Sequence, residues 1–341
     1  MKKPLLLSIF TFLVFLSFTV IVSCTKEGDQ GPAGENGING TNGSDGTAGC
    51  VTCHTMTEDL IARIFQWENS IHATGGNYDR NTESCAPCHT SMGFREVVQT
   101  GAQETTDVIQ NPTPINCYTC HAIHETYTAA DWALRVTGPV TFWNNTTESI
   151  DAGTGSVCVQ CHQMRVVDPA IDPATPGTIV NMTNKRFGGH HGPQGNIFAG
   201  IGGYEFTGGT YPNSMHTTLV TNGCVTCHMA DPPYGDQIGG HQMSATPTGC
   251  VACHPDEDAL DLKVLETYIM IDTLLTQLRI ELELAGIYAG GYLAVPADYT
   301  FDQLGAYLNY QIVNEDLSYG VHNYAYAKAL LENSIAAVKK D

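Results

Sequence analysis

The clearest hydrophobic pattern lies near the end of the 341-residue chain. Over residues 257–285, apolar side chains recur on one side of a helical projection, which predicts an amphipathic helix. They are Leu260, Val264, Ile271, Leu275, Leu278 and Leu282. A second helix is predicted over residues 300–313 with Thr300 as its N-cap, and a third over 320–339 with cations in its last turn. We expect an antiparallel helical segment, residues 257–341, that docks on the rest of the chain.

Residues 50–256 show no comparable pattern. Turn-forming stretches such as Asn111–Pro114, Asp168–Gly177 and Asp231–Gly235 interrupt them. Glycine is abundant at 35 residues and charged residues make up only 15% of the chain. We therefore predict a mostly irregular and α-helical fold class with sparse secondary structure. The core of residues 50–256 should be filled by something other than side chains.

The first residues have the pattern of an export signal. Two lysines precede the apolar stretch Leu5–Val22. Ser23 and Cys24 follow, which resembles a bacterial lipoprotein signal, in which the cysteine is lipidated and becomes the first mature residue. We expect residues 1–23 to be a signal peptide and Cys24 to carry a lipid that holds the protein at the outer membrane, facing the periplasm or the cell surface. The alternatives are a plain cleaved signal and an uncleaved anchor helix.

Residues 24–49 have the composition of a tether. Glycine recurs at every third position from Gly28 to Gly49, which is collagen-like spacing. Pro32 is the single proline in this stretch, whereas a triple helix needs many. We therefore expect a flexible hydrophilic tether between the lipid and the folded part.

The net charge of −20 limits the choice of partners. A surface so acidic repels a phosphate backbone, which argues against nucleic acid as a partner. It suits docking to basic partners.

The cysteines carry the strongest chemical signal. Twelve of the 13 fall in six copies of Cys-x-x-Cys-His, and Cys24 is the remaining one. The copies are Cys50-x-x-Cys53-His54, Cys85-x-x-Cys88-His89, Cys117-x-x-Cys120-His121, Cys158-x-x-Cys161-His162, Cys224-x-x-Cys227-His228 and Cys250-x-x-Cys253-His254.

This motif predicts covalent attachment of c-type haem. The two thiols bond to the two vinyl groups of a porphyrin, and the histidine coordinates the iron as the proximal ligand. Six haems in residues 50–256 would supply the missing core, so this segment is expected to be a hexahaem cytochrome domain. The twelve cysteines are then the cofactor-binding residues.

Other uses of the cysteines fit less well. Zinc binds CxxC pairs, but zinc knuckles need no histidine directly after the second cysteine. A redox dithiol would not be repeated six times. A disulfide scaffold is the weaker interpretation of so regular a pattern.

The remaining histidines are candidates for the second axial position. Seven histidines lie outside the motifs, and six are needed if every haem takes two imidazoles. We predict as distal ligands His72, His124, His191, His216, His241 and His322. Of the adjacent pair His190 and His191, the second is favoured because it begins the turn-forming stretch HGPQG. Histidines suffice, so Met92, Met164 and Met229 are expected to be packing residues.

Haems with two protein imidazoles favour conduction of electrons, because the iron has no open position for a substrate. The prediction is an electron-transfer cytochrome with no catalytic residue. It would relay electrons between membrane quinol-oxidising donors and other cytochromes or an extracellular acceptor in respiration. Two alternatives stay open. One is a reductase of nitrite, hydroxylamine or a sulfur oxyanion with one five-coordinate haem. The other is a filament subunit, an oligomer in which one protomer ligates a haem of the next.

Several stretches resemble bacterial multihaem cytochromes c. They are WENSIHA, CAPCHTSMGF, NCYTCHAIHETY, HHGPQGNIFAGIGGYEF and SYGVHNYAYAKALLENS. The last resembles the haem-ligating C-terminal helix of the superfamily of pentahaem nitrite reductases and octahaem hydroxylamine oxidoreductases. The resemblance implies that His216, His241 and His322 are distal ligands. Pentahaem reductases usually attach their catalytic haem through CxxCK, whereas all six motifs here end in histidine, which puts reductase activity in doubt.

Overall fold

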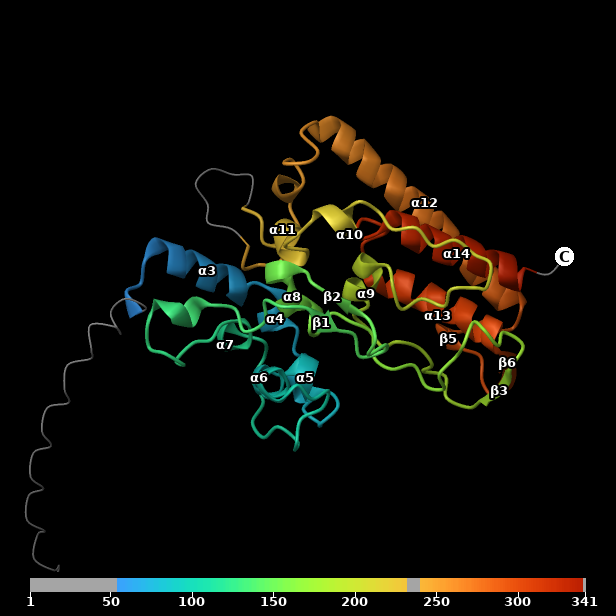
Figure 1. The fold of residues 1–341 in the computed structure, drawn as a ribbon, viewed down its shortest axis with the longest axis horizontal. Helices are drawn as coiled ribbons and strands as arrows, with labels where there is room; N and C mark the ends of the chain where they lie inside the picture. The colour runs from blue at the N-terminus through green and yellow to red at the C-terminus, as the bar shows by residue number, and fades with distance from the viewer. Residues whose placement is uncertain (1–53, 232–239, 340–341) are drawn as a thin grey trace, which may run out of the picture. The chain divides into compact units, whose positions relative to one another are not determined.

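Short helices joined by long loops form the first part of the described chain, and three long helices form the last part (Figure 1). The computed structural model describes residues 54–231 and 240–339, which belong to one compact unit, Gly46–Asp341. The predicted signal peptide, lipidation site and tether lie outside these residues, as do Cys50 and Cys53.

The region before residue 257 contains little regular structure, as its sequence predicts. Its α-helices are α3 (Glu58–Glu68), α4 (Ile71–Thr74), α5 (Ala86–His89), α6 (Ser91–Thr100), α7 (Cys117–Cys120), α8 (Ser156–Val159), α9 (Gln194–Ala199), α10 (His216–Leu219) and α11 (Cys224–His228). Its 3₁₀ turns are η2 (Asn77–Asp79), η3 (Ala129–Trp132), η4 (Gly153–Gly155) and η5 (Pro247–Gly249). Its strands are β1 (Val140–Thr141), β2 (Ser149–Ile150) and β3 (Ile179–Met182).

The three long helices lie close to their predicted positions. They are α12 (Glu257–Leu284), α13 (Phe301–Asp316) and α14 (Tyr324–Val338). Thr300 caps α13 as predicted: its Oγ1 accepts a hydrogen bond from Gln303 N (3.2 Å), and Gln303 Oε1 accepts one from Thr300 N (2.9 Å). The last helix begins four residues later than predicted, because residues 317–323 form a turn that ends at the N-cap Asn323.

Strand pairing joins the two parts of the chain. The strand β6 (Ala297–Thr300) precedes α13 and pairs antiparallel with β3, from Ile179 opposite Thr300 to Met182 opposite Ala297. The hairpin of β4 (Tyr288–Ala289) and β5 (Tyr292–Leu293) follows α12. The short strands β1 and β2 form a third pair. The sequence pattern did not indicate β3 or β6, since each is too short to show an alternating pattern.

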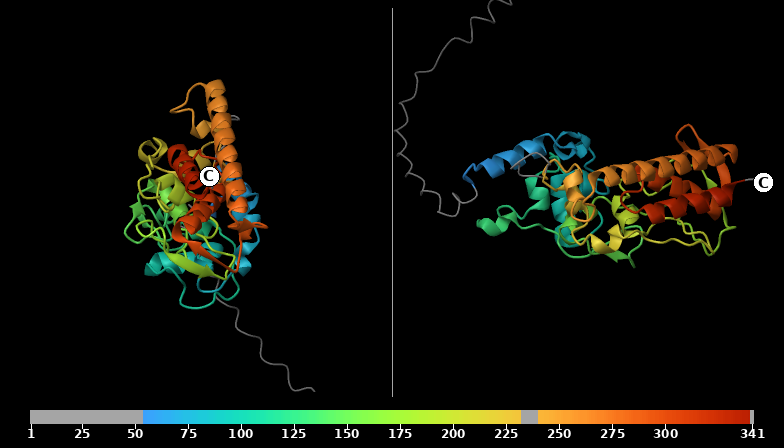
Figure 2. Two further views of the ribbon diagram at one scale, coloured as in Figure 1. Left: turned by 90° about the vertical axis from the view of Figure 1, so that its right-hand side faces the viewer. Right: turned by 90° about the horizontal axis from the view of Figure 1, so that it is seen from above.

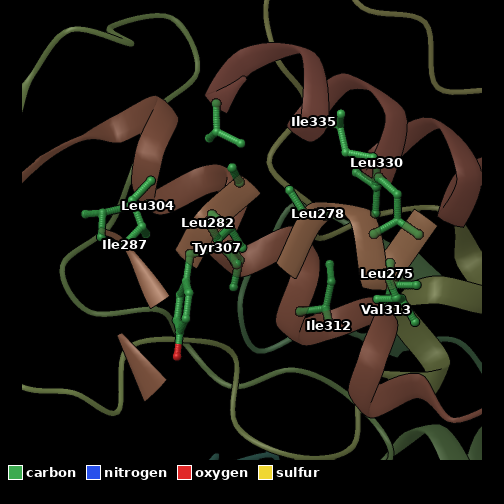
Figure 3. Close-up of a cluster of buried hydrophobic side chains, with 14 of the residues drawn as sticks. Leu275, Leu278, Leu282, Ile287, Leu304, Tyr307, Ile312, Val313, Leu330 and Ile335 are labelled. Carbon is green, nitrogen blue, oxygen red and sulfur yellow. The ribbon is translucent and has the colours of Figure 1, made fainter. Parts of the chain in front are cut away.

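The main hydrophobic core lies among the long helices (Figure 3). The buried face of α12 consists of Ile271, Leu274, Leu275, Leu278 and Leu282. Side chains of α13 and α14 oppose it, including Tyr307, Ile312 and Leu330. A second, smaller cluster in the first part consists of Val140, Phe142, Ala152 and Val159. Side-chain packing is thus concentrated in the helical segment.

The predicted apolar face of α12 is buried only from Ile271 onward. Val264 remains 42% exposed, and no residue of α12 before Ile271 is buried. Figure 2 shows the reason, because α14 runs alongside only the C-terminal part of α12.

A buried polar residue fixes α13 to its neighbours. Asn309 is fully buried and donates to the carbonyl of Tyr204 (2.8 Å) and to Ser334 Oγ (3.0 Å). Its Oδ1 accepts from Tyr204 N at 2.7 Å. These bonds join α13 to the loop after α9 and to α14.

Within residues 54–231 and 240–339, we find no helix with the length and apolar character that crossing a membrane requires.

The packing of α12 makes a testable prediction. Leu278→Ala removes a fully buried side chain from the main core and should lower the free energy of unfolding by about 2–5 kcal/mol. Leu284→Ala is the matched control on the same helix, because Leu284 is 74% exposed, and it should change the free energy by less than about 0.5 kcal/mol. Denaturant unfolding followed by far-ultraviolet circular dichroism measures both. Equal effects would contradict the packing described.

Candidate functional site

Each described Cys-x-x-Cys-His motif forms a single helical turn. In four of the five fully described motifs the histidine amide donates to the carbonyl of the first cysteine, at 3.2 Å for Cys85, 3.0 Å for Cys117, 2.9 Å for Cys158 and 2.9 Å for Cys250. The fifth, Cys224–His228, is the helix α11. Residues i, i+3 and i+4 of a helical turn lie on one face. The two thiols and the imidazole of a motif therefore lie on the same side of the turn, as attachment to one flat cofactor requires.

The thiols do not form a zinc site. Among the described residues, no three side chains of His, Cys, Asp or Glu converge where a metal ion could sit, whereas structural zinc takes four such ligands. Most of the thiols are also unsuited to redox exchange. Burial raises the pKa of Cys120 to about 11 and also raises the pKa of Cys227, and reactive cysteines need a lowered pKa. Cys88 and Cys224 are exceptions, because the neighbouring thiol of Cys161 lowers the pKa of Cys88 and that of Cys158 lowers the pKa of Cys224 to about 7.

The imidazoles of the six motifs each face one further histidine. Every pair joins a motif histidine to one outside the motifs, and no histidine occurs in two such pairs. The ring centroids are separated by 6.1 Å for His54 and His124, 6.2 Å for His162 and His72, 6.4 Å for His89 and His190, 6.4 Å for His121 and His241, 6.2 Å for His254 and His216, and 6.2 Å for His228 and His322.

This separation is the one expected for two imidazoles on opposite sides of one metal. An imidazole nitrogen lies about 2.0–2.1 Å from a transition metal and its ring centroid about 1.1 Å farther, which places the two centroids about 6.3 Å apart. The observed range of 6.1–6.4 Å lies around this value. The side chains of the chain thus fit a haem iron with two axial histidines.

Direct contact between the rings explains the pairs less well. Aromatic contacts have centroid separations of about 4.5–7 Å, and their angle and distance depend on each other. Here the distance is nearly constant while the interplanar angle runs from 17° to 88°. Two rings bound to one metal are free to rotate about the axis that joins them, so coordination accounts for both observations.

Hydrogen bonds at Nδ1 orient seven of these twelve rings. Six of these rings have neutral partners: Trp132 O for His121 (2.6 Å), Tyr118 Oη for His124 (3.1 Å), Gln194 Oε1 for His162 (3.2 Å), Val321 O for His216 (2.8 Å), Met243 O for His228 (3.1 Å) and Met243 Sδ for His72 (3.0 Å). The seventh, His322, lies 2.7 Å from the carboxylate of Asp316. Occupation of Nδ1 leaves Nε2 available to a metal and fixes the plane of the ring.

The adjacent histidines His190 and His191 have different surroundings. His190 has a φ of 66° and faces His89. The side chain of His191 is 74% exposed, and its Nδ1 lies 2.8 Å from Glu315 Oε2. The sequence-based prediction favoured His191, but the geometry favours His190 as the partner of His89. The stretch HGPQG begins at His191, so it is His190, the residue before this stretch, that lies opposite His89.

Burial keeps several of the paired imidazoles neutral, which is the form that binds metals. Burial, together with the charge of His162, lowers the pKa of His72 to about 4. Burial and the neighbouring His191 lower the pKa of His190 to about 4. His322 differs: burial lowers its pKa, but the carboxylate of Asp316 outweighs burial and the pKa is raised.

The motifs come into contact with one another. The thiol of Cys161 donates to the carbonyl of Pro87 in the second motif (3.6 Å), and Cys224 packs against the cluster that contains Val159 of the fourth motif. Thr246 joins the fifth and sixth motifs, because its amide donates to the carbonyl of Cys227 (3.4 Å) and its carbonyl accepts from the thiol of Cys250 (4.0 Å). The fourth motif, Cys158–His162, thus lies beside the second and the fifth, and the fifth lies beside the sixth.

Two further connections run through single residues or short segments. His121 and His124 belong to different pairs and are separated by two residues. Met243 contacts the rings of His228 and His72, which also belong to different pairs. These connections bring the first motif near the third, and the fourth near the fifth.

A buried carboxylate shapes the loop that carries His124, whose φ is 62°. Asp131 accepts hydrogen bonds from the amides of His124 (2.8 Å), Thr126 (2.7 Å) and Tyr127 (3.1 Å). Burial opposes its charge, but these bonds outweigh burial and hold the pKa of Asp131 below its usual value.

The sequence alone did not indicate which residues orient the histidine rings. Gln194, Met243 and Asp316 are ordinary residue types far from the motifs in sequence, and no pattern marks them. Met164 is fully buried in the main core, as expected for a packing residue.

Comparison with known proteins shows the fold. No family model and no curated protein matches the chain. The crystal structure of the outer cell wall cytochrome OcwA is similar at a TM-score of 0.54 and 23% identity, over 81% of this chain and 50% of that one. The chain therefore spans about half the length of OcwA. The likeness confirms the predicted fold, that of a multihaem cytochrome.

A second structure is also similar. It is the catalytic subunit, NrfA, of the cytochrome c nitrite reductase from Desulfovibrio desulfuricans, at a TM-score of 0.44 and 19% identity, over 76% of this chain and 64% of that one.

Proposed function

We propose that this protein transfers electrons through six c-type haems, each held between a motif histidine and one further histidine. The observation that carries the proposal is the set of six histidine pairs at 6.1–6.4 Å. The proposed ligand pairs are those of the site, with His190 in place of the predicted His191. The proposed attachment residues are the twelve motif cysteines, including Cys50 and Cys53, which lie outside the described residues.

A haem iron with two imidazole ligands takes up and releases an electron without exchanging ligands. The chain supports electron transfer by fixing the orientation of the histidine rings. Their Nδ1 atoms bond to backbone carbonyls and to side chains such as Gln194 and Asp316, so a ring that loses its orientation also loses a hydrogen bond.

The contacts between motifs support a continuous path for electrons. The second, fourth, fifth and sixth motifs follow one another in space through the contacts described above. The third motif joins this series because Thr119 donates to the hydroxyl of Ser91, which follows the second motif (2.9 Å). The His121–His124 segment then joins the third motif to the first.

The six histidine pairs also argue against the two alternative functions, a reductase and a filament subunit. A reductase needs an iron with one open face, and a filament needs a haem that lacks a partner histidine within its own chain. All six motif histidines, from His54 to His254, face a second histidine of the same chain. No separate observation favours catalysis.

The proposed setting is outside the cytoplasm. A signal peptide over residues 1–23, a lipid at Cys24 and a tether over 24–49 would place the haem-bearing part at the outer membrane. OcwA, whose fold is similar, is named as an outer cell wall cytochrome. The net charge of −20 suits redox partners with basic docking surfaces. Such partners would be other cytochromes and the membrane enzymes that oxidise quinol.

The haem count and spin state test this proposal directly. The purified protein should contain six haems per chain by the pyridine haemochrome assay. Its ferric electron paramagnetic resonance spectrum should be entirely low-spin, because every iron has two imidazoles, and the reduced protein should not bind carbon monoxide. A high-spin signal in the native protein would show an open iron and contradict the proposal.

The ligand assignment at the second motif is tested by adjacent substitutions. His190→Ala removes the partner of His89 and should convert one haem in six to the high-spin form, with carbon monoxide binding on reduction. His191→Ala is the matched control and should leave all six haems low-spin. The reverse result would restore His191 as the ligand, as the sequence first indicated.

The lipid anchor is tested at Cys24. Cys24→Ser should abolish incorporation of labelled fatty acid and move the protein from the membrane fraction to the soluble fraction. Ser23→Ala keeps both the cysteine and a small preceding residue, and should stay in the membrane fraction. Membrane association that survives Cys24→Ser would point instead to an uncleaved anchor helix.

A further inference from the structure

A single buried carboxylate sits behind one of the paired histidines. Asp316 is the last residue of α13, and its side chain is 1% exposed. Its Oδ1 lies 2.7 Å from Nδ1 of His322. Its Oδ2 accepts a hydrogen bond from the hydroxyl of Ser318. Both carboxylate oxygens of Asp316 thus have a partner at a position from which water is nearly excluded.

This arrangement sets His322 apart from the other paired histidines whose Nδ1 partners the structure describes. Those partners are backbone carbonyls, an amide oxygen, a phenol and a thioether, all of them neutral. His191 also meets a carboxylate, that of Glu315, but His191 is not one of the paired histidines. Among the paired histidines whose Nδ1 partners are described, His322 is therefore the one that bonds to a carboxylate.

A carboxylate at Nδ1 changes the ligand more than a carbonyl does. It pulls the Nδ1 proton toward itself, which gives the imidazole part of the character of an imidazolate and makes Nε2 a stronger donor. A stronger donor, and the added negative charge, stabilise ferric iron more than ferrous iron. The low dielectric of a buried site strengthens the effect of the charge.

We propose that Asp316 sets the reduction potential of the haem held by His228 and His322, and keeps it below the value that a neutral hydrogen-bond acceptor would give. The inference rests on the proposed function, since it assumes haem between these two histidines. Asp316 acts through His322 and is a positioning and tuning residue.

The position of the His228–His322 pair in the molecule gives a lowered reduction potential a function. The motif of His228 lies between the fourth motif, where Cys224 packs against the cluster of Val159, and the sixth, which Thr246 joins to Cys227. Nδ1 of His216, the partner of His254, bonds to the carbonyl of Val321, the residue before His322. A centre of lowered potential here would separate the sixth haem energetically from the others, so that electrons reach it over an uphill step.

The experiment compares two adjacent carboxylates. Asp316→Asn keeps an oxygen acceptor of the same shape for His322 and removes the charge. Glu315→Gln is the matched control, because the carboxylate of Glu315 lies 2.8 Å from Nδ1 of His191, which is not one of the six paired histidines. Spectropotentiometric titration of the full haem-loaded protein should show that Asp316→Asn raises the midpoint potential of one haem in six. The control should leave all six unchanged, and Asp316→Glu should restore the low potential.

The outcomes separate the two proposals. If Asp316→Asn leaves all potentials unchanged while the haem count and low-spin spectrum match the native protein, tuning by Asp316 is wrong and the proposed function stands. If Asp316→Asn produces a high-spin haem, Asp316 holds His322 in place and does not set the potential, which also overturns the inference. If the native protein itself lacks six low-spin haems, the proposed function fails first, before either variant is compared.

Discussion

The separation of 6.1–6.4 Å between paired imidazoles is the constraint on which this structure depends. It must be met six times by a chain that has few regular elements of its own before α12. Each of the six pairs brings a motif histidine, such as the one at the end of α5 or α11, opposite a histidine outside the motifs. If the irons are bound as proposed, these cross-connections replace much of the hydrophobic packing that a region of this size would otherwise need. The loops can then be long and irregular, because their ends are fixed by coordination.

The helical segment has two functions in this arrangement. Its own core, from Ile271 to Leu330, is an ordinary packed interior. The end of α13 and the turn before α14 provide groups of the candidate site: His322 as a paired histidine, the carbonyl of Val321 for His216, and Asp316 for His322. A rigid helical platform thus holds the turn that meets the fifth and sixth motifs. The pair β3 and β6 fastens the same platform to the loop region.

The sequence predicted the parts of the molecule that rest on local rules. Helical periodicity located α12, α13 and α14 within a few residues, and Thr300 was identified as a cap from its residue type and position. The motif spacing identified the thiols and the motif histidines. The pairings could not be predicted, because they join residues at long and unrelated separations in the chain. Which of His190 and His191 faces His89 depends on the left-handed backbone conformation of His190. The neighbouring residue types did not predict this conformation. The residues that orient the rings were invisible for the same reason: Gln194 and Asp316 act through tertiary contacts alone.

Met243 belongs to two sites at once. Its carbonyl holds the ring of His228, while its sulfur contacts the ring of His72. The backbone of this residue is in the left-handed region, at a φ of 56°, so it has little freedom to satisfy one ring by moving away from the other. With irons bound as proposed, a change in charge at one centre would alter the pull on its imidazole and pass through a single residue to the second centre. The two centres would then titrate as an interacting couple, each one's affinity for an electron depending on whether the other is already reduced.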